Sequence, residues 1–278
     1  MVENMTYGTD YHYIPVTSIQ SGSFQLIAPE VWTLTVQIVN VVFIGTQDKS
    51  RWILVDAGMP GSADSILKAV NERFGEGSRP TAILLTHGHF DHVGSIVELA
   101  GRWDVPVMAH PQELPYLTGR LAYPPGDPTV SSGLLAKLSP WYPNEPIDLG
   151  SRVNALPEDE SIPGMPGWEW IHTPGHTPGH VSLFRKADRV LIAGDAFVTV
   201  KQESLYSVLT QELEIGGPPQ YFTMNWQEAS DSVKKLEALR PTVAVTGHGK
   251  PANEEWLGVH LKRLADEFER IAVPGRGH

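Results

Sequence analysis

The stretch Thr86-His87-Gly88-His89-Phe90-Asp91-His92 places four metal-capable side chains within six positions. It directly follows the apolar run Ala82-Ile83-Leu84-Leu85, which predicts a buried strand. The four side chains are therefore expected where a strand opens into a loop. Imidazole and carboxylate groups are suited to binding Zn²⁺, Fe²⁺ or Mn²⁺. Such a loop can direct its first two histidines at one ion, and its aspartate and last histidine at a second.

Two downstream segments also place a ligand-type side chain after an apolar run. Asp195 follows the run at 190–193, and Gly194 lets the backbone turn closely there. His248 stands between two glycines after the run at 243–246. Alone, these residues would indicate only a turn and an ordinary loop histidine. Their weight comes from occurring in one chain with the histidine stretch.

A third segment, Thr173-Pro174-Gly175-His176-Thr177-Pro178-Gly179-His180, offers several histidines. Its proline and glycine residues predict a tight turn that can present an imidazole. His172, His176 and His180 are all candidates by position, since His172 ends one expected strand and His180 begins the next.

Together these residues resemble the metal site of the metallo-β-lactamase-fold hydrolases, in the branch of glyoxalase II and the lactonases. A His-x-His pair alone is weak evidence, whereas His-x-His-x-Asp-His after an apolar strand is a specific signal. The family pattern Thr-Pro-Gly-His-Thr-x-Gly selects His176 from the three histidines. The resemblance spans roughly Leu34 to the C-terminus and implies the family's four-layered αβ/βα sandwich.

The resemblance implies a dinuclear centre with two divalent metal ions, Zn²⁺ first and Fe²⁺ or Mn²⁺ as alternatives. It assigns the first ion to His87, His89 and His176, and the second to Asp91, His92 and His248, with Asp195 bridging the two. Asp56 resembles the family's aspartate behind the metal loop, which orients a ligand histidine through its other ring nitrogen. A simple turn cap is the alternative role for Asp56.

The order of the expected elements also suits an α/β fold in which two sheets lie between outer helices. We expect strands at residues 34–44, 51–55, 82–85, 105–109, 168–171, 181–184, 190–193 and 243–246. We expect helices at residues 62–74, 94–100, 230–239 and 254–271. The first two strands form a hairpin around the turn Gly45-Thr46-Gln47-Asp48. The sequence thus predicts a single domain over residues 1–278.

Two irregular segments interrupt this pattern, at about residues 111–146 and 199–225. The first is rich in proline and carries several aromatic residues. Each segment is a surface excursion with its own small core, a site of oligomer contacts, or a lid or wall of a substrate pocket.

The bulk composition excludes several classes of protein. The 278 residues include no cysteine, so disulfides and thiolate chemistry are absent. A net charge of -11 argues against binding a nucleic-acid backbone. No stretch approaches the ~20 apolar residues that span a bilayer, and the first residues do not resemble a signal peptide. We expect a cytoplasmic protein with a small-molecule substrate and no nucleic-acid or membrane partner.

Two divalent ions a few ångströms apart lower the pKa of a shared water, which gives hydroxide at neutral pH. Asp91 can take up or deliver a proton as the leaving group departs. Asp195 makes the chain more similar to glyoxalase II-type thioesterases, lactonases and phosphodiesterases than to the secreted zinc β-lactamases. Many lactonases place a tyrosine three positions after this aspartate, where this chain has Val198. A lactonase would then need Tyr116, Tyr123, Tyr206 or Tyr221 instead.

The sequence therefore favours a dinuclear metal-dependent hydrolase of a carbonyl ester or lactone. One alternative is a glyoxalase II-type thioesterase, in which Lys262 and Arg263 would bind glutathione, although both also fit an exposed helix face. From another class, a mononuclear-iron oxygenase of sulfur substrates stays open, as does a metal-binding protein without turnover.

Overall fold

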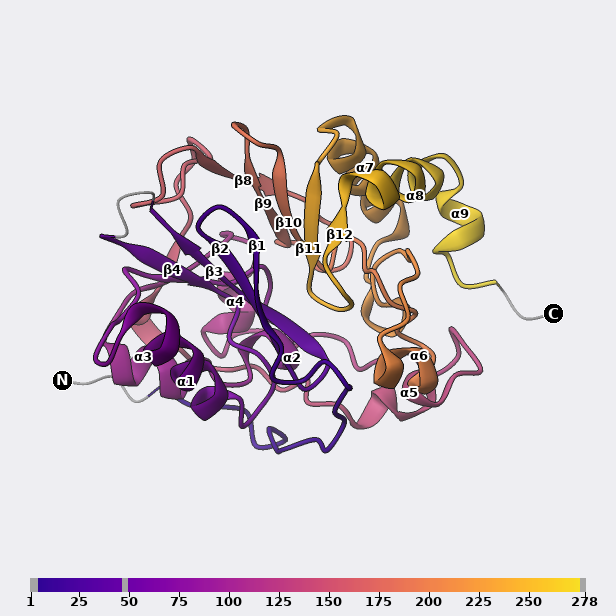
Figure 1. Cartoon of the computed structure of the whole chain (residues 1–278). Coiled ribbons are helices and arrows are strands. Elements are labelled where there is room, and N and C mark those ends of the chain that lie inside the picture. Colours follow the sequence, from indigo (N-terminus) through magenta and orange to yellow (C-terminus); the bar gives the residue numbers. More distant parts are fainter. Residues whose placement is uncertain (1–4, 47–49, 276–278) are drawn as a thin grey trace. The chain divides into compact units, whose positions relative to one another are not determined.

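The computed structural model describes residues 5–46 and 50–275 (Figure 1). The chain divides into two compact units. Unit 1 comprises Met1–Tyr123 and Pro143–Pro166, and unit 2 comprises Pro124–Tyr142 and Gly167–His278. Each unit contains one β-sheet and its own helices. The expected α/β class with two sheets is therefore confirmed, while the expectation of a single domain stays a prediction.

Unit 1 is built on a seven-stranded sheet in simple sequence order. Its strands are β1 (Phe24–Ala28), β2 (Val31–Val36), β3 (Val39–Gly45), β4 (Trp52–Val55), β5 (Ile83–Leu84), β6 (Val107–Ala109) and β7 (Val153–Ala155). Strands β1 to β4 pair antiparallel, and β4 to β7 pair parallel. The carboxyl ends of β4, β5 and β6 consequently meet at one edge of the sheet, where an α/β protein collects functional side chains.

The helices of unit 1 join the parallel strands and cover the sheet. They are α1 (Ala63–Phe74), α2 (Phe90–Val93), α3 (Ile96–Trp103), α4 (Leu114–Leu117) and the 3-10 turn η2 (Gly150–Arg152). Figure 1 shows α1 and α3 side by side. Phe74 stacks on Trp52 of β4 with ring centroids 4.4 Å apart, and Trp103 meets the edge of the same indole at 5.9 Å. This aromatic cluster ties both helices to β4.

Unit 2 contains a five-stranded sheet in the order β12-β11-β10-β9-β8. Its strands are β8 (Trp168–His172), β9 (Val181–Arg185), β10 (Val190–Gly194), β11 (Val243–Thr246) and β12 (Ala252–Asn253). Only the β10–β11 pair is parallel among these five described strands. The carboxyl ends of β10 and β11 therefore lie next to each other.

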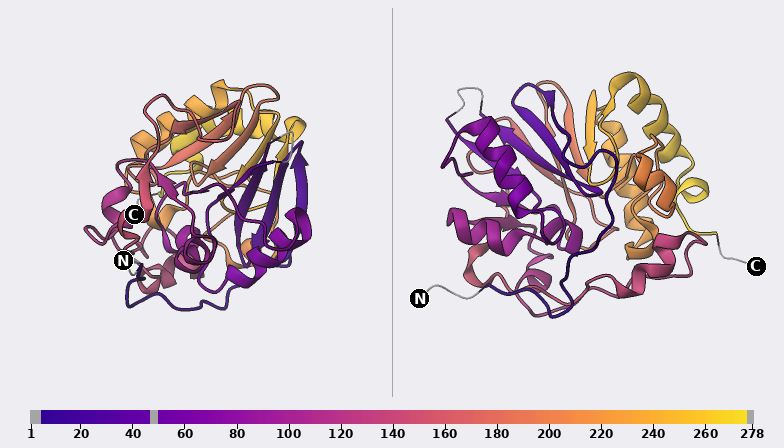
Figure 2. Two further views of the ribbon diagram at one scale, coloured as in Figure 1. Left: turned by 90° about the vertical axis from the view of Figure 1, so that its left-hand side faces the viewer. Right: turned by 60° about the horizontal axis from the view of Figure 1, so that its bottom comes forward.

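Two longer helices cover this second sheet. The helices of unit 2 are α5 (Leu134–Leu138), α6 (Leu205–Thr210), α7 (Trp226–Ala238), α8 (Glu254–Asp266), α9 (Phe268–Ile271), and the 3-10 turns η1 (Ser139–Trp141) and η3 (Gln220–Phe222). Figures 1 and 2 show α7 and α8 side by side. Their apolar faces pack on the sheet through one buried cluster that includes Leu191, Val233 and Leu261.

Several expected boundaries were wrong. The expected strand at 34–44 is two strands, β2 and β3, because the chain turns at Gln37, whose φ is +55°. Neither glycine nor asparagine marks this turn, and apolar residues flank it on both sides. The expected helix at 254–271 ends at Asp266 and restarts at Phe268. Strands β1, β7 and β12 were not expected. In the expected turn at 45–48, residues 47 and 48 lie outside the described residues.

The two irregular segments contain short helices. Residues 111–146 carry α4, α5 and η1, and the part from Pro124 to Tyr142 belongs to unit 2. Residues 199–225 carry α6 and η3, also in unit 2. Among the described residues, no helix has the length and apolar character needed to span a membrane.

Candidate metal centre

The histidine stretch lies at the carboxyl edge of the unit 1 sheet. After β5, the chain passes through Thr86 into a loop and then into the single turn of α2. The side chains that we call the first set are buried; they are His87, His89, Asp91 and His92. Ligand atoms of His87 lie within 4.8 Å of those of His89 and of His92, and those of Asp91 and His92 are equally close. The short helix thus folds the spaced sequence motif into one cluster.

Asp56 fixes the orientation of this first set from the end of β4. The backbone N–H of Thr86 donates to Asp56 Oδ1 at 2.7 Å, and the Thr86 hydroxyl donates to Oδ2 at 2.8 Å. His92 Nδ1 lies 2.8 Å from the same Oδ2. A carboxylate only accepts, so Nδ1 carries the proton and Nε2 of His92 carries the lone pair.

The same carboxylate acts on a second ring through Thr86. Because the Thr86 hydroxyl gives its proton to Asp56, its oxygen accepts from His87 Nδ1 at 3.0 Å. Nε2 of His87 then also carries the lone pair. One buried aspartate therefore sets the tautomers of two imidazoles, which is the arrangement that supports metal-binding histidines.

The second set lies in unit 2 and consists of His176, Asp195 and His248. Asp195 follows β10 and His248 follows β11, so the parallel pairing of these strands brings the two residues together. His176 Nε2 lies 3.6 Å from Asp195 Oδ2, and His248 Nε2 lies 3.4 Å from that same oxygen. All three side chains are at most 2% exposed. One carboxylate oxygen thus lies within 3.6 Å of two imidazole nitrogens.

The His176 loop is held against the start of α7. The Gly175 carbonyl accepts hydrogen bonds from the backbone N–H groups of Met224 at 3.0 Å and Asn225 at 2.8 Å. Gly175 has φ of +130°, and a Cβ there would lie 2.2 Å from the Ala229 nitrogen. Only glycine allows this close approach. His176 Nδ1 also lies 3.4 Å from the Thr223 hydroxyl.

His180, one of the three open histidine candidates, supports Asp195 from behind. Its Nε2 accepts the backbone N–H of Asp195 at 2.9 Å, so its Nδ1 carries the proton. That proton faces the Thr173 hydroxyl at 2.9 Å, from which hydrogen bonds continue through Ser182 to the Ala193 carbonyl. His172 instead lies 2.8 Å from the Pro178 carbonyl through Nε2. His172 and His180 therefore support the β8–β9 loop and the strands beside it through hydrogen bonds.

In the second set, each imidazole lies at the distance from Asp195 that two ligands of one cation would have. Two ligand atoms bound tetrahedrally at 2.0–2.1 Å lie about 3.3 Å from each other. The contacts of 3.4 and 3.6 Å to Asp195 are close to that value and longer than a strong hydrogen bond. Burying carboxylates and imidazoles is costly without a compensating partner. The residues present therefore fit divalent cations such as Zn²⁺, Fe²⁺ or Mn²⁺.

The tyrosines have different surroundings from those expected. Tyr206 is 71% exposed on α6, and Tyr221 is buried against Phe222. Sequence reasoning did not single out Tyr11, yet its surroundings include Asp91. Burial, then the charges of Asp10 and Asp91, raise the pKa of Tyr11, so its hydroxyl stays protonated. The link between Tyr11 and Asp91 crosses 80 positions of sequence, and no local motif signals it.

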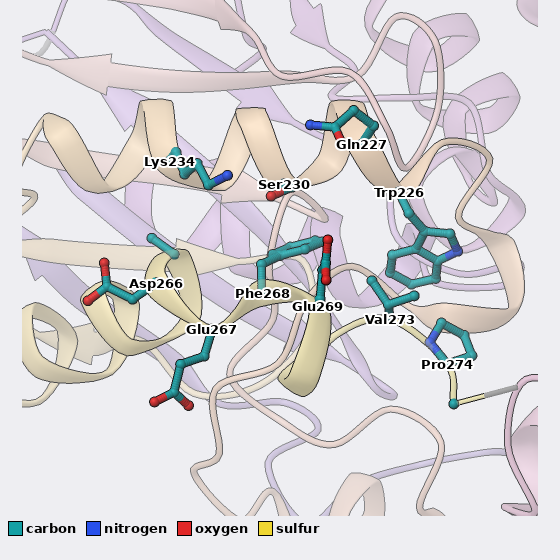
Figure 3. A pocket seen from close by; sticks show the side chains of 12 residues that line it. Trp226, Gln227, Ser230, Lys234, Asp266, Glu267, Phe268, Glu269, Val273 and Pro274 are labelled. Carbon is teal, nitrogen blue, oxygen red and sulfur yellow. The ribbon is translucent and has the colours of Figure 1, made fainter.

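Two cavities in unit 2 differ in their relation to these residues. A cavity of about 590 Å³ lies between α7 and residues 265–275, and none of the candidate ligands lines it (Figure 3). A smaller cavity of about 310 Å³ is lined by Thr223, which contacts His176. Its apolar lining comes from both irregular segments; it includes Pro124, Pro125, Val130, Tyr221, Phe222 and Met224.

The fold agrees with comparisons to known proteins. A sequence model of the metallo-beta-lactamase superfamily matches residues 34–248. The chain belongs to the metallo-β-lactamase superfamily, as the resemblance implied. It is 50% identical over 260 residues to the Bacillus subtilis protein named "Probable metallo-hydrolase YflN", covering 93% of this chain and 98% of that protein.

Two other known proteins are also similar to the chain. Hydroxyacylglutathione hydrolase of Erwinia tasmaniensis is 32% identical over 145 residues, which cover 52% of this chain and 43% of that enzyme. The solved structure of TTHA1623 in a di-iron-bound form matches with a TM-score of 0.55 and 25% identity, over 85% of this chain and 98% of that one.

Replacing Asp56 tests whether it orients the first set. Asp56→Ala removes the acceptor that fixes His87 and His92, so metal affinity should fall by about 10- to 100-fold. Chelator competition on the purified protein measures this change. Asp64→Ala, which removes an exposed carboxylate in the first turn of α1, is the matched control and should keep the parent affinity. Parent affinity in folded Asp56→Ala would reduce Asp56 to a turn cap.

Proposed function

We propose that the chain is a dinuclear metal-dependent hydrolase in which the first and second sets bind two divalent cations together. His87, His89 and His176 would hold one cation, and Asp91, His92 and His248 the other, with Asp195 bridging both. The observation that carries this proposal is that one Asp195 carboxylate oxygen lies 3.4 and 3.6 Å from two buried imidazole nitrogens. The membership of the chain in the metallo-β-lactamase superfamily supports it.

Two bound cations would supply Lewis acidity and an activated water near neutral pH. The residues of the chain would orient the metal ligands and supply a proton to the leaving group. Asp56 and Thr86 would keep the Nε2 atoms of His87 and His92 available as ligands. Asp91 would deliver a proton to the departing group. The hydrogen bond from the Asp195 backbone N–H to His180 would hold Asp195 in place in the second set.

The substrate we propose is a neutral carbonyl ester, with lactones the first compounds to test. The 310 Å³ cavity beside Thr223 has prolines, aromatic rings and methionine in its lining, which suit an apolar acyl or ring group. The net charge of -11 disfavours polyanionic substrates such as nucleic acids. The two irregular segments would thus act as the wall of a substrate pocket.

The thioesterase alternative would need Lys262 and Arg263 to bind glutathione, but both side chains already pair with acidic residues. Lys262 forms a hydrogen-bonded ion pair with Asp266 at 2.8 Å, and both side chains are more than half exposed. Arg263 lies 3.7 Å from Glu267 in the same i,i+4 pattern. These contacts fit a solvated helix face, which leaves little reason to assign glutathione to this surface.

Asp195→Ala tests the hydrolytic proposal. Because the bridge would hold both cations near one water, hydrolysis should fall by at least about 100-fold, in line with several kcal/mol of lost charge stabilisation. Rates would be measured on lactones, aryl esters, glutathione thioesters and phosphodiesters, with circular dichroism to check the fold. Asp231→Ala, on the exposed face of α7, is the control and should retain full activity.

The panel also separates the alternatives. Fastest turnover of lactones or aryl esters is the expected result. Brisk turnover of glutathione thioesters alone would move the chain to the thioesterase class. One iron per chain, with oxygen consumption on a sulfur substrate, would identify an oxygenase and contradict the hydrolase proposal.

Phe222→Ala tests the proposed substrate wall. Shortening this side chain should lower kcat/KM for esters with bulky apolar acyl groups by about 10-fold, but change acetyl esters little. Metal content should stay unchanged, because Phe222 is not among the candidate ligands. Tyr206→Ala provides the comparison, since Tyr206 is an exposed aromatic residue outside the cavity lining. An identical substrate profile for Phe222→Ala and the parent would refute the wall.

A further inference from the structure

A buried carboxylate that the sequence did not single out lies behind the histidine loop of unit 1. Glu113 precedes α4 and has 0% exposure. The backbone N–H of Gly88 donates to Glu113 Oε2 at 3.0 Å. The Tyr123 hydroxyl donates to the same oxygen. The Tyr123 hydroxyl oxygen also lies 3.1 Å from the Gly88 nitrogen and accepts from the Gly88 N–H. Glu113 and Tyr123 thus enclose the peptide that links His87 to Gly88, and we call this pair the loop clamp.

The close approach of the clamp explains the residue between the two histidines. A Cβ on Gly88 would lie 2.8 Å from the Tyr123 hydroxyl and 3.2 Å from Leu117 Cδ2. Leu117 is fully buried in α4, so it has little room to move away. Glycine at this position is therefore a consequence of the clamp and not of an unusual backbone conformation.

The ring of Tyr123 holds the second histidine of the motif. Its centroid lies 4.5 Å from that of His89, with the ring planes at 58°. On its other side Tyr116 stacks on Tyr123, with centroids 4.0 Å apart and planes at 2°. The clamp therefore contacts the loop at two points. One is the peptide after His87, and the other is the imidazole ring of His89.

The clamp is energetically costly to break. A buried carboxylate needs hydrogen bonds to offset its lost hydration, and bonds to a charged acceptor are about twice as strong as neutral ones. Burial and the neighbouring Glu113 raise the pKa of Tyr123 well above its ordinary value, so its hydroxyl keeps the proton that it donates. Loss of the Tyr123 hydroxyl removes one of the two donors to Glu113 Oε2, and loss of the carboxylate leaves the buried Tyr123 hydroxyl without this acceptor.

We infer that Glu113 and Tyr123 are positioning residues that hold His87 and His89 in the geometry needed to bind metal. The inference rests on the proposed metal centre. A loop that is already fixed loses less conformational entropy when the cation binds. The Tyr123 hydroxyl is hydrogen-bonded to Glu113 and Gly88. Tyr123 therefore does not replace the lactonase tyrosine hydroxyl that is missing at Val198.

Three variants of the whole chain test the clamp. Tyr123→Phe removes only the hydroxyl and keeps the ring against His89. Glu113→Gln removes the charge at constant size. Tyr116→Phe is the matched control, because Tyr116 stacks on the same ring but its hydroxyl is outside the clamp. Zinc affinity is measured by chelator competition, and the melting temperature is measured in excess chelator.

Tyr123→Phe and Glu113→Gln should weaken zinc binding by about 10- to 100-fold, as for other residues that orient ligands. Tyr116→Phe should stay within about three-fold of the parent. The melting temperature in chelator should fall for Tyr123→Phe by no more than the loss of one hydrogen bond explains, because Glu113 still accepts from the Gly88 N–H. A purely structural role would lower the melting temperature without a selective loss of zinc affinity.

Parent-like affinity in folded Tyr123→Phe would overturn the clamp, and this variant decides the matter if Glu113→Gln does not fold. A large drop in melting temperature with unchanged affinity would also overturn it. If the parent protein itself binds no zinc, iron or manganese, the proposed function fails together with the clamp. Tight binding by the parent and all variants refutes the clamp alone.

Discussion

The hydrogen bonds from Thr86 and His92 to Asp56 determine what the histidine loop can do. A buried imidazole can bind a cation only if the correct nitrogen carries its lone pair. Asp56 accepts directly from His92 and, through the Thr86 hydroxyl, controls His87. The same carboxylate also accepts the Thr86 backbone N–H, so it fixes where the loop leaves β5. The proposed chemistry depends on this one buried group.

The two units use a common construction. In unit 1, β4 and β5 run parallel, and Asp56 and Thr86 follow shortly after their ends. In unit 2, β10 and β11 run parallel and end beside Asp195 and His248. Parallel strands bring distant sequence segments to one edge, where their loops can be close without being consecutive. A supporting group then holds each set, Asp56 in unit 1 and His180 in unit 2.

The sequence predicted most of what depends on short-range pattern. Apolar runs followed by histidine or aspartate indicated the strands and the candidate ligands, and the family pattern singled out His176. The turn at Gln37 escaped prediction because its neighbours are apolar and no glycine marks it. Glu113 and Tyr11 escaped because their contacts with Gly88 and the surroundings of Asp91 join residues that are far apart in sequence. Such contacts depend on tertiary packing, which a local motif does not encode.

The proposed dinuclear centre requires that the first and second sets share two cations. Anomalous diffraction at the zinc edge, from crystals of the zinc-loaded protein, tests this sharing most directly. We expect two peaks. One should have His87, His89 and His176 as ligands, the other Asp91, His92 and His248, with Asp195 bound to both and with metal–ligand distances of about 2.0–2.2 Å. A single peak, or two peaks each bound only by residues of one unit, would show that the two sets do not share two cations.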